Sequence, residues 1–166
     1  IPLYAADPDL TIWGTKSGSR QIFAESDVPH PDGCHDRLDS VDDLATATAQ
    51  LWERQPDLKR MVVKLNEGIS GEANALFDLR PLQEFAPGKI SHSDRVAAIK
   101  DSLPSLRFQA ASENWTNYAS RIPELGAIVE AFVEGEVKRS PSVQGRILPD
   151  GTVEILSTHD QILGGP

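Results

Sequence analysis

A lysine followed by a glycine-rich loop is the feature of this sequence best suited to chemistry. Residues 61–79 read MVVKLNEGISGEANALFDL, in which two apolar runs flank a polar loop. Lys64 alternates with the apolar residues of the first run, so its amino group is expected on the opposite face of a strand, beside the loop. Glycines let backbone N–H groups approach an anion, and a serine adds a hydrogen bond. The combination predicts a phosphate clamp with loop donors from Gly68, Ser70 and Gly71.

This segment differs from a P-loop. No Gly-Lys-Ser/Thr ends the loop, and the chain re-enters a strand-like run at 75–79 instead of a helix. A β-hairpin with a glycine-rich tip is therefore expected. Such a hairpin can equally be a structural turn with one exposed lysine, so the phosphate interpretation needs support from elsewhere in the chain.

Residues 128–135, IVEAFVEG, supply that support. They form a short apolar run with two glutamates and a closing glycine, which predicts a strand that leads into a turn. At this point the chain resembles the ATP-grasp superfamily, in which a lysine-bearing strand and a glycine-rich hairpin cover the ATP phosphates and a Glu-x-Phe-Val-x-Gly hinge lies along the adenine. Glu130, Phe132, Val133 and Gly135 match that hinge.

Further blocks extend the resemblance over nearly the whole chain. Residues 15–23 (TKSGSRQIF), followed by VPHPDG at 28–33, are similar to the family's first ATP-contacting lysine, here Lys16, and to its next loop. Residues 140–165 look closest to carboxylate–amine ligases of the pheganomycin-type peptide ligase kind. The resemblance implies a partial ATP-grasp fold of the α+β class, with a glycine-rich β-hairpin lid, helices and the start of a larger antiparallel sheet.

The resemblance also implies a reaction. The γ-phosphate of ATP would activate a carboxylate as an acylphosphate, and an amine would attack it to form an amide or peptide bond. ATP and Mg²⁺ are the implied cofactors, and small-molecule or peptide carboxylates and amines are the implied substrates. At the matched positions, Lys16 and Lys64 would hold phosphate oxygens. Backbone groups of Ala131 and Val133 would contact the adenine edge, and Glu130 would receive or orient the adenine amino group.

Two positions depart from the family pattern. A glutamate two places after the hinge glycine often holds the nucleotide ribose, but Val137 stands there, with Glu134 and Glu136 as the alternatives. Ala73 stands where related loops commonly carry glycine, so the tip of the clamp is expected to be less mobile. Neither change removes Lys64 or the backbone donors.

The resemblance divides the chain into three parts. These are an opening segment with helices at 1–60, a lid subdomain with the glycine-rich hairpin at 61–127, and the hinge strand with the first hairpin of a C-terminal subdomain at 128–166. Because the sequence starts with Ile1 and stops without a closing element, it is expected to be a fragment. The magnesium ligands of the superfamily come from later strands, so no metal site is expected within this chain. The alternatives are a non-catalytic nucleotide-binding or interaction module derived from the same fold, and a purely structural α+β domain.

Helix-capping patterns predict two helices before the lysine-bearing strand. Thr15 is the expected N-cap of a short helix that starts at Lys16 and reaches about Glu25. Residues 40–54 combine a serine cap, two aspartates in the first turn and apolar residues at helical spacing, which predicts an amphipathic helix. Trp52 lies on its apolar face and is expected in the core, not at a cofactor.

The later elements are less regular until the end of the chain. Residues 80–107 contain three prolines and weak periodicity, which predict a variable connection with a short helix near 93–103. Residues 113–121 predict another helix, which Gly126 ends before the hinge strand. The Pro-Asp-Gly turn at 149–151 separates two alternating runs, so a β-hairpin is expected there.

Composition limits the class of protein. The 166 residues, 39% hydrophobic and 25% charged, can bury one core. A net charge of -9 argues against non-specific binding to nucleic acid, so an anionic nucleotide must be met locally by lysines and magnesium. Cys34 is the single cysteine, which excludes an intrachain disulfide. No apolar run suggests a membrane span or signal peptide, and a cytoplasmic location is expected.

Two remaining features leave alternatives open. The four histidines are scattered without the spacing of zinc ligands. His159 and Asp160 lie in a dense polar cluster, STHDQ, which is either a polar strand end or part of the site of the resembled ligases. An exposed edge of the final sheet would permit a homo-oligomer.

Overall fold

The computed structural model describes residues 7–68, 73–137 and 139–162. The chain divides into two compact units, Ile1–Phe132 and Val133–Pro166, and each is described by itself. Helices and antiparallel strands occur together, which confirms the predicted α+β class.

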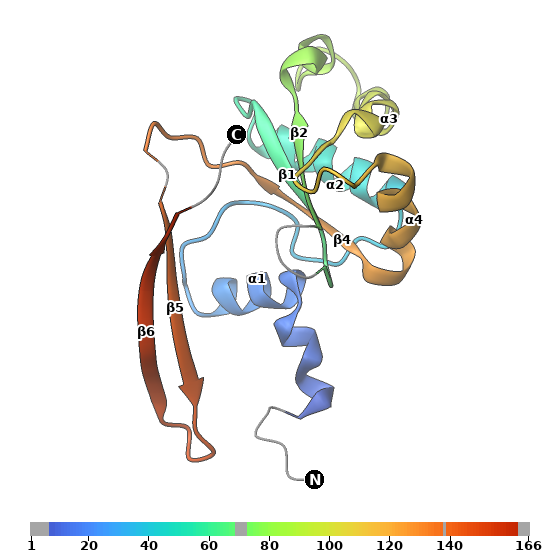
Figure 1. Ribbon diagram of the computed structural model, residues 1–166. Helices are drawn as coiled ribbons and strands as arrows, with labels where there is room; N and C mark the ends of the chain where they lie inside the picture. Colours follow the sequence, from blue (N-terminus) through green and yellow to red (C-terminus); the bar gives the residue numbers. More distant parts are fainter. Residues whose placement is uncertain (1–6, 69–72, 138, 163–166) are drawn as a thin grey trace. The chain divides into compact units, whose positions relative to one another are not determined.

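Four strands form the sheet of the first unit. They are β1 (Arg60–Leu65), β2 (Asn74–Asp78), β3 (Arg107–Phe108) and β4 (Ala127–Ala131). Their order is β3-β2-β1-β4, and each neighbouring pair is antiparallel (Figure 1). β1 and β2 are the arms of the hairpin predicted around the glycine-rich loop, so that prediction is confirmed.

β1 has one buried face and one partly exposed face. Met61, Val63 and Leu65 are fully buried, whereas Val62 and Lys64 alternate with them on the other face. A strand shows this alternation when the apolar core lies on one side of its sheet. The apolar pattern of the sequence therefore predicts the direction of the Lys64 side chain correctly.

Helices cover the buried face of the sheet. The helical elements of this unit are η1 (Pro8–Gly14), α1 (Lys16–Glu25), α2 (Val41–Arg54), η3 (Arg80–Phe85), α3 (His92–Ser102), η4 (Leu103–Ser105) and α4 (Trp115–Leu125). α2, α3 and α4 pack on the face from which Met61 and Val63 project (Figure 1). The predicted helix starts are confirmed, since Thr15 Oγ1 accepts the Gly18 N–H at 3.1 Å and Ser40 Oγ accepts the Asp43 N–H at 3.0 Å.

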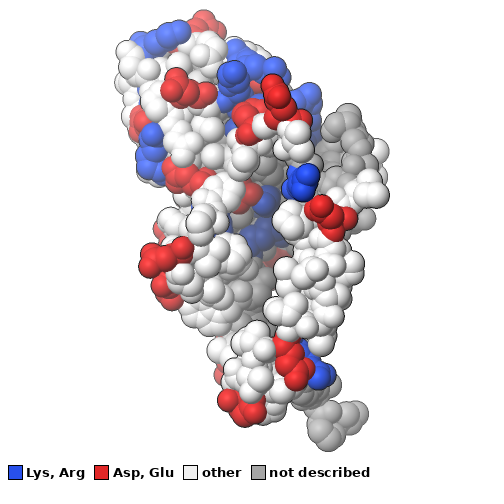
Figure 2. Space-filling view, turned by 90° about the vertical axis from the view of Figure 1, so that its left-hand side faces the viewer, with Lys and Arg blue, Asp and Glu red and all other residues white. Residues whose placement is uncertain are grey.

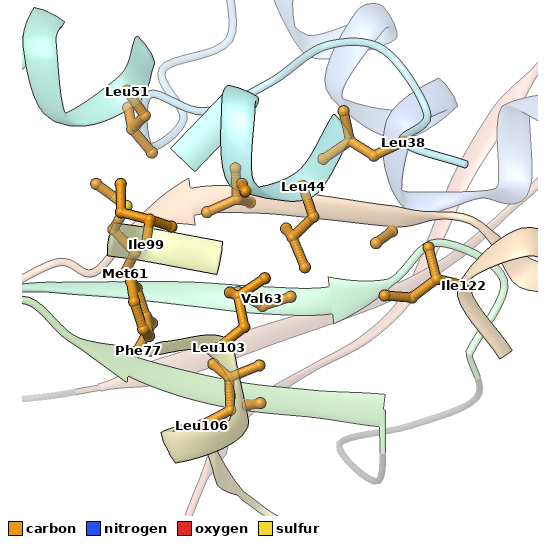
Figure 3. Packing of buried hydrophobic residues seen from close by; sticks show 14 of the residues in the cluster. Leu38, Leu44, Leu51, Met61, Val63, Phe77, Ile99, Leu103, Leu106 and Ile122 are labelled. Atoms are coloured by element: carbon orange, nitrogen blue, oxygen red, sulfur yellow. The ribbon is translucent and has the colours of Figure 1, made fainter. Parts of the chain in front are cut away.

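The core lies between these helices and the sheet. Figure 3 shows Leu44 of α2 beside Val63 of β1, with Ile122 of α4 farther along the strand, and all three belong to one apolar cluster. Trp52 is fully buried, which confirms that it belongs to the core. Each fully buried side chain of leucine or phenylalanine size stabilises the fold by about 1.5–3 kcal/mol through removal of apolar surface from water.

The connection after β2 contains more structure than the sequence predicts. The helix expected near 93–103 is confirmed as α3, and the helix expected at 113–121 as α4. The two-residue strand β3 was not predicted. Two residues are too few to show a periodicity, and β3 is a strand only because it pairs with Ala75 and Leu76 of β2.

The hinge strand belongs to the same sheet as the lysine-bearing strand. β4 pairs with β1 so that Val63 lies opposite Val129. The family resemblance places this strand in a part that runs from 128 to 166, whereas the division between the two units falls after Phe132. The three-part division of the chain stays a prediction.

The second unit contains a β-hairpin. β5 (Ser140–Ile147) and β6 (Val153–Gln161) pair antiparallel, with a register shift between Gln144 and Gly145. The turn closes through the Leu148 N–H, which donates to the Thr152 carbonyl at 2.9 Å. Gly151 has a φ of 85°, a conformation that favours glycine, so the Pro-Asp-Gly signal predicts this turn correctly.

Candidate functional site

The polar face of the sheet joins Lys64 to Glu130. The antiparallel register places Val62 opposite Glu130, so Lys64, two residues farther along β1, is the diagonal neighbour of Glu130 on the same face. The Nζ of Lys64 donates to Oε1 of Glu130. The side chains are 25% and 13% exposed, respectively, so the glutamate is the more enclosed partner.

Arg20 is the second partner of Glu130. Its Nη1 donates to Oε2 of Glu130 at 3.0 Å, and its side chain is only 5% exposed. Because Arg20 lies on α1, this pair fastens α1 to the polar face of the sheet. The sequence assigned no role to Arg20, although its four-residue spacing from Lys16 places both cations on one face of α1.

Lys16 anchors the start of α1 to the base of the glycine-rich loop. Its Nζ donates to the carbonyl of Gly68 at 2.7 Å, and its backbone N–H donates to the carbonyl of Asn66 at 3.2 Å. The N–H of Ser17 donates to Oδ1 of Asn66 at 2.8 Å. Burial and the nearby positive charge of Lys64 lower the pKa of Lys16, and the charge of Glu130 partly offsets them. The two lysines are therefore close enough to repel each other.

The loop base is tightly packed at its two ends. A Cβ atom on Gly68 would lie 2.2 Å from the Cβ of Ala73, so glycine is needed there for close approach. The hydroxyl of Tyr118 donates to the carbonyl of Ala73 at 3.1 Å and ties this end of the loop to α4. Ser70 and Gly71, two of the predicted loop donors, lie outside the described residues.

The hinge residues have backbone partners of their own. The N–H of Ala131 donates to the carbonyl of Asp32 at 2.7 Å, and the N–H of Phe132 donates to the carbonyl of Arg60 at 3.2 Å. The Arg60 guanidinium lies 4.1 Å from the centre of the Phe132 ring. Val133 is exposed and begins the second unit. Adenine contacts by Ala131 and Val133 stay a prediction.

A backbone strap, residues 31–38, covers the outer edge of β4. The N–H of Cys34 donates to the carbonyl of Val129 at 2.9 Å, and Leu38 and Ala127 exchange two hydrogen bonds at 2.9 and 2.8 Å. The N–H of Val129 donates to Cys34 Sγ at 3.2 Å, and burial raises the pKa of this thiol. The strap therefore protects the strand edge from pairing with another chain.

A surface pocket of about 260 Å³ lies elsewhere, between the strap and α2. Its charged lining includes Asp32 and Arg54, which pair with each other at 3.1 Å. Burial raises the pKa of Asp32, but hydrogen bonds and the charge of Arg54 outweigh it, so the net pKa is lowered. This pocket does not include Lys16, Lys64 or Glu130, and we assign it no role.

Charge is mixed on the face of the molecule shown in Figure 2, where both basic and acidic side chains are visible. In the part of the chain that the structure describes, no three His, Cys, Asp or Glu side chains are grouped to hold a metal ion. The helices in that part include none with the length and apolar character needed to cross a bilayer.

Comparisons with known proteins identify the family of the chain. The family described as IQCH-like, ATP-grasp matches residues 10–165. The chain is 33% identical over 156 residues to L-propargylglycine--L-glutamate ligase of Streptantibioticus cattleyicolor, which covers 92% of this chain and 29% of that ligase. It is 27% identical over 186 residues to IQ motif-containing protein H of Danio rerio, which covers 99% of this chain and 18% of that protein. No solved structure matches the chain.

The fold and the matches define an ATP-grasp protein that is related to the carboxylate–amine ligases, as the sequence motifs predicted. Within that superfamily, the chain belongs to the IQCH-like ATP-grasp family. It spans less than a third of the length of these curated relatives.

Proposed function

We propose that this chain binds the phosphates of ATP through Lys16 and Lys64 and is the ATP-binding part of a carboxylate–amine ligase. The observation that carries the proposal is the placement of the two lysines. Lys16 of α1 donates to the carbonyl of Gly68 at the base of the glycine-rich loop, and Lys64 of β1, the strand that leads into this loop, pairs with Glu130. Together with Arg20, they place three positive charges near the carboxylate of Glu130.

Charge explains why such a cluster suits a polyphosphate. Two partly buried lysines that repel each other raise the free energy of the protein without ligand, and an anion between them relieves this repulsion. A charge-assisted hydrogen bond to a phosphate oxygen is about twice as strong as a neutral one. The residues present therefore fit the phosphates of ATP, with the backbone of Gly68 and its loop expected to cover them.

The chemistry proposed for the whole protein follows that of the superfamily. ATP supplies the phosphoryl group that converts a carboxylate into an acylphosphate, and an amine then forms the amide or peptide bond. The task of this chain is to position the phosphates and stabilise their charge. The described residues do not form a magnesium site, so we assign no Mg²⁺ ligand among them.

Calorimetric titration with ATP and magnesium tests the proposal. Replacement of either lysine, in Lys16→Ala or Lys64→Ala, should weaken ATP binding by about 1–3 kcal/mol, since each removes a charge-assisted contact. Lys100→Ala is the matched control, because Lys100 lies on α3 and pairs with Asp42 away from this cluster. Wild-type affinity in both lysine variants would refute the assignment.

A non-catalytic nucleotide-binding or interaction module is the second candidate. Its support is the family match itself, shared with IQ motif-containing protein H, together with Val137 at the position where relatives often carry the ribose-binding glutamate. An assay of phosphate release by the full-length protein, with panels of amino acid carboxylates and amines, separates the two functions. ATP binding without substrate-dependent phosphate release would favour the module.

A further inference from the structure

The Arg20 guanidinium is held in three directions. Its Nε donates to the carbonyl of Cys34 at 2.9 Å, its Nη2 to the carbonyl of Pro31 at 2.8 Å, and its Nη1 to the carboxylate of Glu130. The two carbonyls belong to the strap and carry no net charge, so Glu130 supplies the negative charge among these three partners. Because the side chain is enclosed and held at each nitrogen, it has little freedom to turn toward a ligand.

Glu130 divides its two oxygens between two cations of different mobility. Oε2 accepts from the enclosed Arg20, and Oε1 accepts from Lys64. The Lys64 side chain is more exposed, and its amino group lies at the end of a flexible four-carbon stem. If Lys64 binds a phosphate, its amino group must leave the Glu130 carboxylate or divide its hydrogen bonds between the carboxylate and the phosphate. A carboxylate enclosed to this degree is strongly destabilising when it loses its only cation. With Arg20 in place, Glu130 keeps a cation after Lys64 has moved.

We infer, resting on the proposed ATP-binding function, that Arg20 is a positioning residue that holds Glu130 in place and compensates its charge while Lys64 transfers from Glu130 to a phosphate oxygen. Arg20 itself does not contact the nucleotide. The carboxylate is thereby fixed beside the adenine end of the site, and Lys64 is released without proton uptake by Glu130.

Several other charged groups lie on the elements packed around Glu130. α1 supplies Lys16 and Arg20, and β1 supplies Lys64. Arg60, on the same face of β1, lies over the Phe132 ring. The neighbouring acidic groups have cations of their own: in the strap Asp32 pairs with Arg54, and on β2 Asp78 pairs with Arg80.

Proton uptake during ATP binding provides the test. ATP with excess magnesium is titrated into the full-length wild-type protein and Arg20→Gln, in buffers of different ionisation enthalpy and at several pH values. In free Arg20→Gln, Lys64 still pairs with Glu130. In the ATP complex of this variant, the enclosed carboxylate of Glu130 has lost both of its hydrogen-bonded cations, which disfavours its charged form. We therefore expect Arg20→Gln to take up more protons than the wild type on binding, and its ATP affinity to fall more steeply as pH rises.

Arg95 offers a matched control. This arginine of α3 is equally enclosed, donates to the carbonyls of Phe85 and Ile90 at 3.0 and 3.1 Å, and pairs with Glu53. Arg95→Gln should therefore lose stability for the same reasons as Arg20→Gln and leave proton uptake unchanged. Arg20→Lys restores a positive charge near Glu130 and should return proton uptake toward the wild-type value.

The outcomes separate the two proposals. If Arg20→Gln binds ATP with wild-type proton uptake while Lys64→Ala weakens binding, the inference about Arg20 is overturned and the proposed function stands. If the wild-type protein does not bind ATP, both fall. Should Arg20→Gln not fold, nitrogen NMR of the wild-type protein decides: the Nε–H signal of Arg20 should persist when ATP is added, and its loss would overturn the inference.

Discussion

Lys64 and Glu130 come from segments far apart in the sequence and meet because β1 pairs with β4 in a register that places Val62 opposite Glu130. A shift of one residue in this register would move one of the two side chains to the helix-covered face. The lysine of the glycine-rich hairpin and the glutamate of the hinge are thus joined before any ligand binds. This relationship makes the cluster sensitive to changes at either residue and at Arg20.

Loss of the Glu130 charge should destabilise the protein. Glu130→Gln leaves the enclosed Arg20 without its carboxylate, and breaking a buried pair in this way costs about 3–5 kcal/mol. The free energy of unfolding from urea denaturation measures the effect. In the control Asp42→Asn, which breaks an exposed pair with Lys100, the cost should be no more than about 1 kcal/mol. Equal costs in the two variants would contradict the view that Arg20 depends on Glu130.

Gly33 should tolerate no larger side chain. A Cβ at this position would lie 2.5 Å from the carbonyl oxygen of Val129 and 2.9 Å from Nη2 of Arg20. Gly33→Ala must therefore displace the strap, at a cost of about 1–3 kcal/mol. Gly14→Ala is the control, since nothing lies within 4 Å of an added Cβ there, and its thermal midpoint should match the wild type or exceed it. A wild-type midpoint for Gly33→Ala would show that the strap is loosely held.

The core should respond strongly to truncation. Phe77 of β2 is fully buried in the apolar cluster, so Phe77→Ala removes apolar contacts and leaves a cavity, with an expected loss of about 3–5 kcal/mol. Leu10→Ala, at a half-exposed position of η1, should change stability by no more than about 0.5 kcal/mol. Chemical denaturation compares the two, and a small effect of Phe77→Ala would place this residue outside the cooperative core.

Asp78 should contribute stability that is lost only in strong acid. Hydrogen bonds from Arg80 outweigh the effect of burial and lower the pKa of Asp78 from 3.8 to about 2. Because the folded-state pKa is depressed, the contribution is fully present above pH 3.8 and disappears as pH falls through about 2. Carboxyl carbon NMR should show this low titration, and Arg80→Gln should move it back toward the ordinary value. An unmoved titration in Arg80→Gln would assign the low pKa to another partner.

Local signals in the sequence predicted much of the secondary structure. The alternation around Lys64 predicted the first arm of the hairpin and the direction of the lysine. Thr15 and Ser40 predicted two helix starts, and the Pro-Asp-Gly turn predicted the last hairpin. These features depend on neighbours within a few residues, through hydrogen bonds at a cap or a turn and through the two-residue period of a strand. The amino-acid sequence of a short segment is therefore enough to predict them.

By itself, then, the sequence determined the α+β class, the ATP-grasp membership and the candidates Lys16, Lys64 and Glu130. Only the tertiary structure decided that Arg20 shares Glu130 with Lys64, that residues 31–38 cover the edge of β4, and that β3 exists. Each of these depends on segments distant in the chain and brought together by burial of the core between α2, α3, α4 and the sheet. No local periodicity encodes such pairings, because their geometry is set by the strand register and the packing of whole elements.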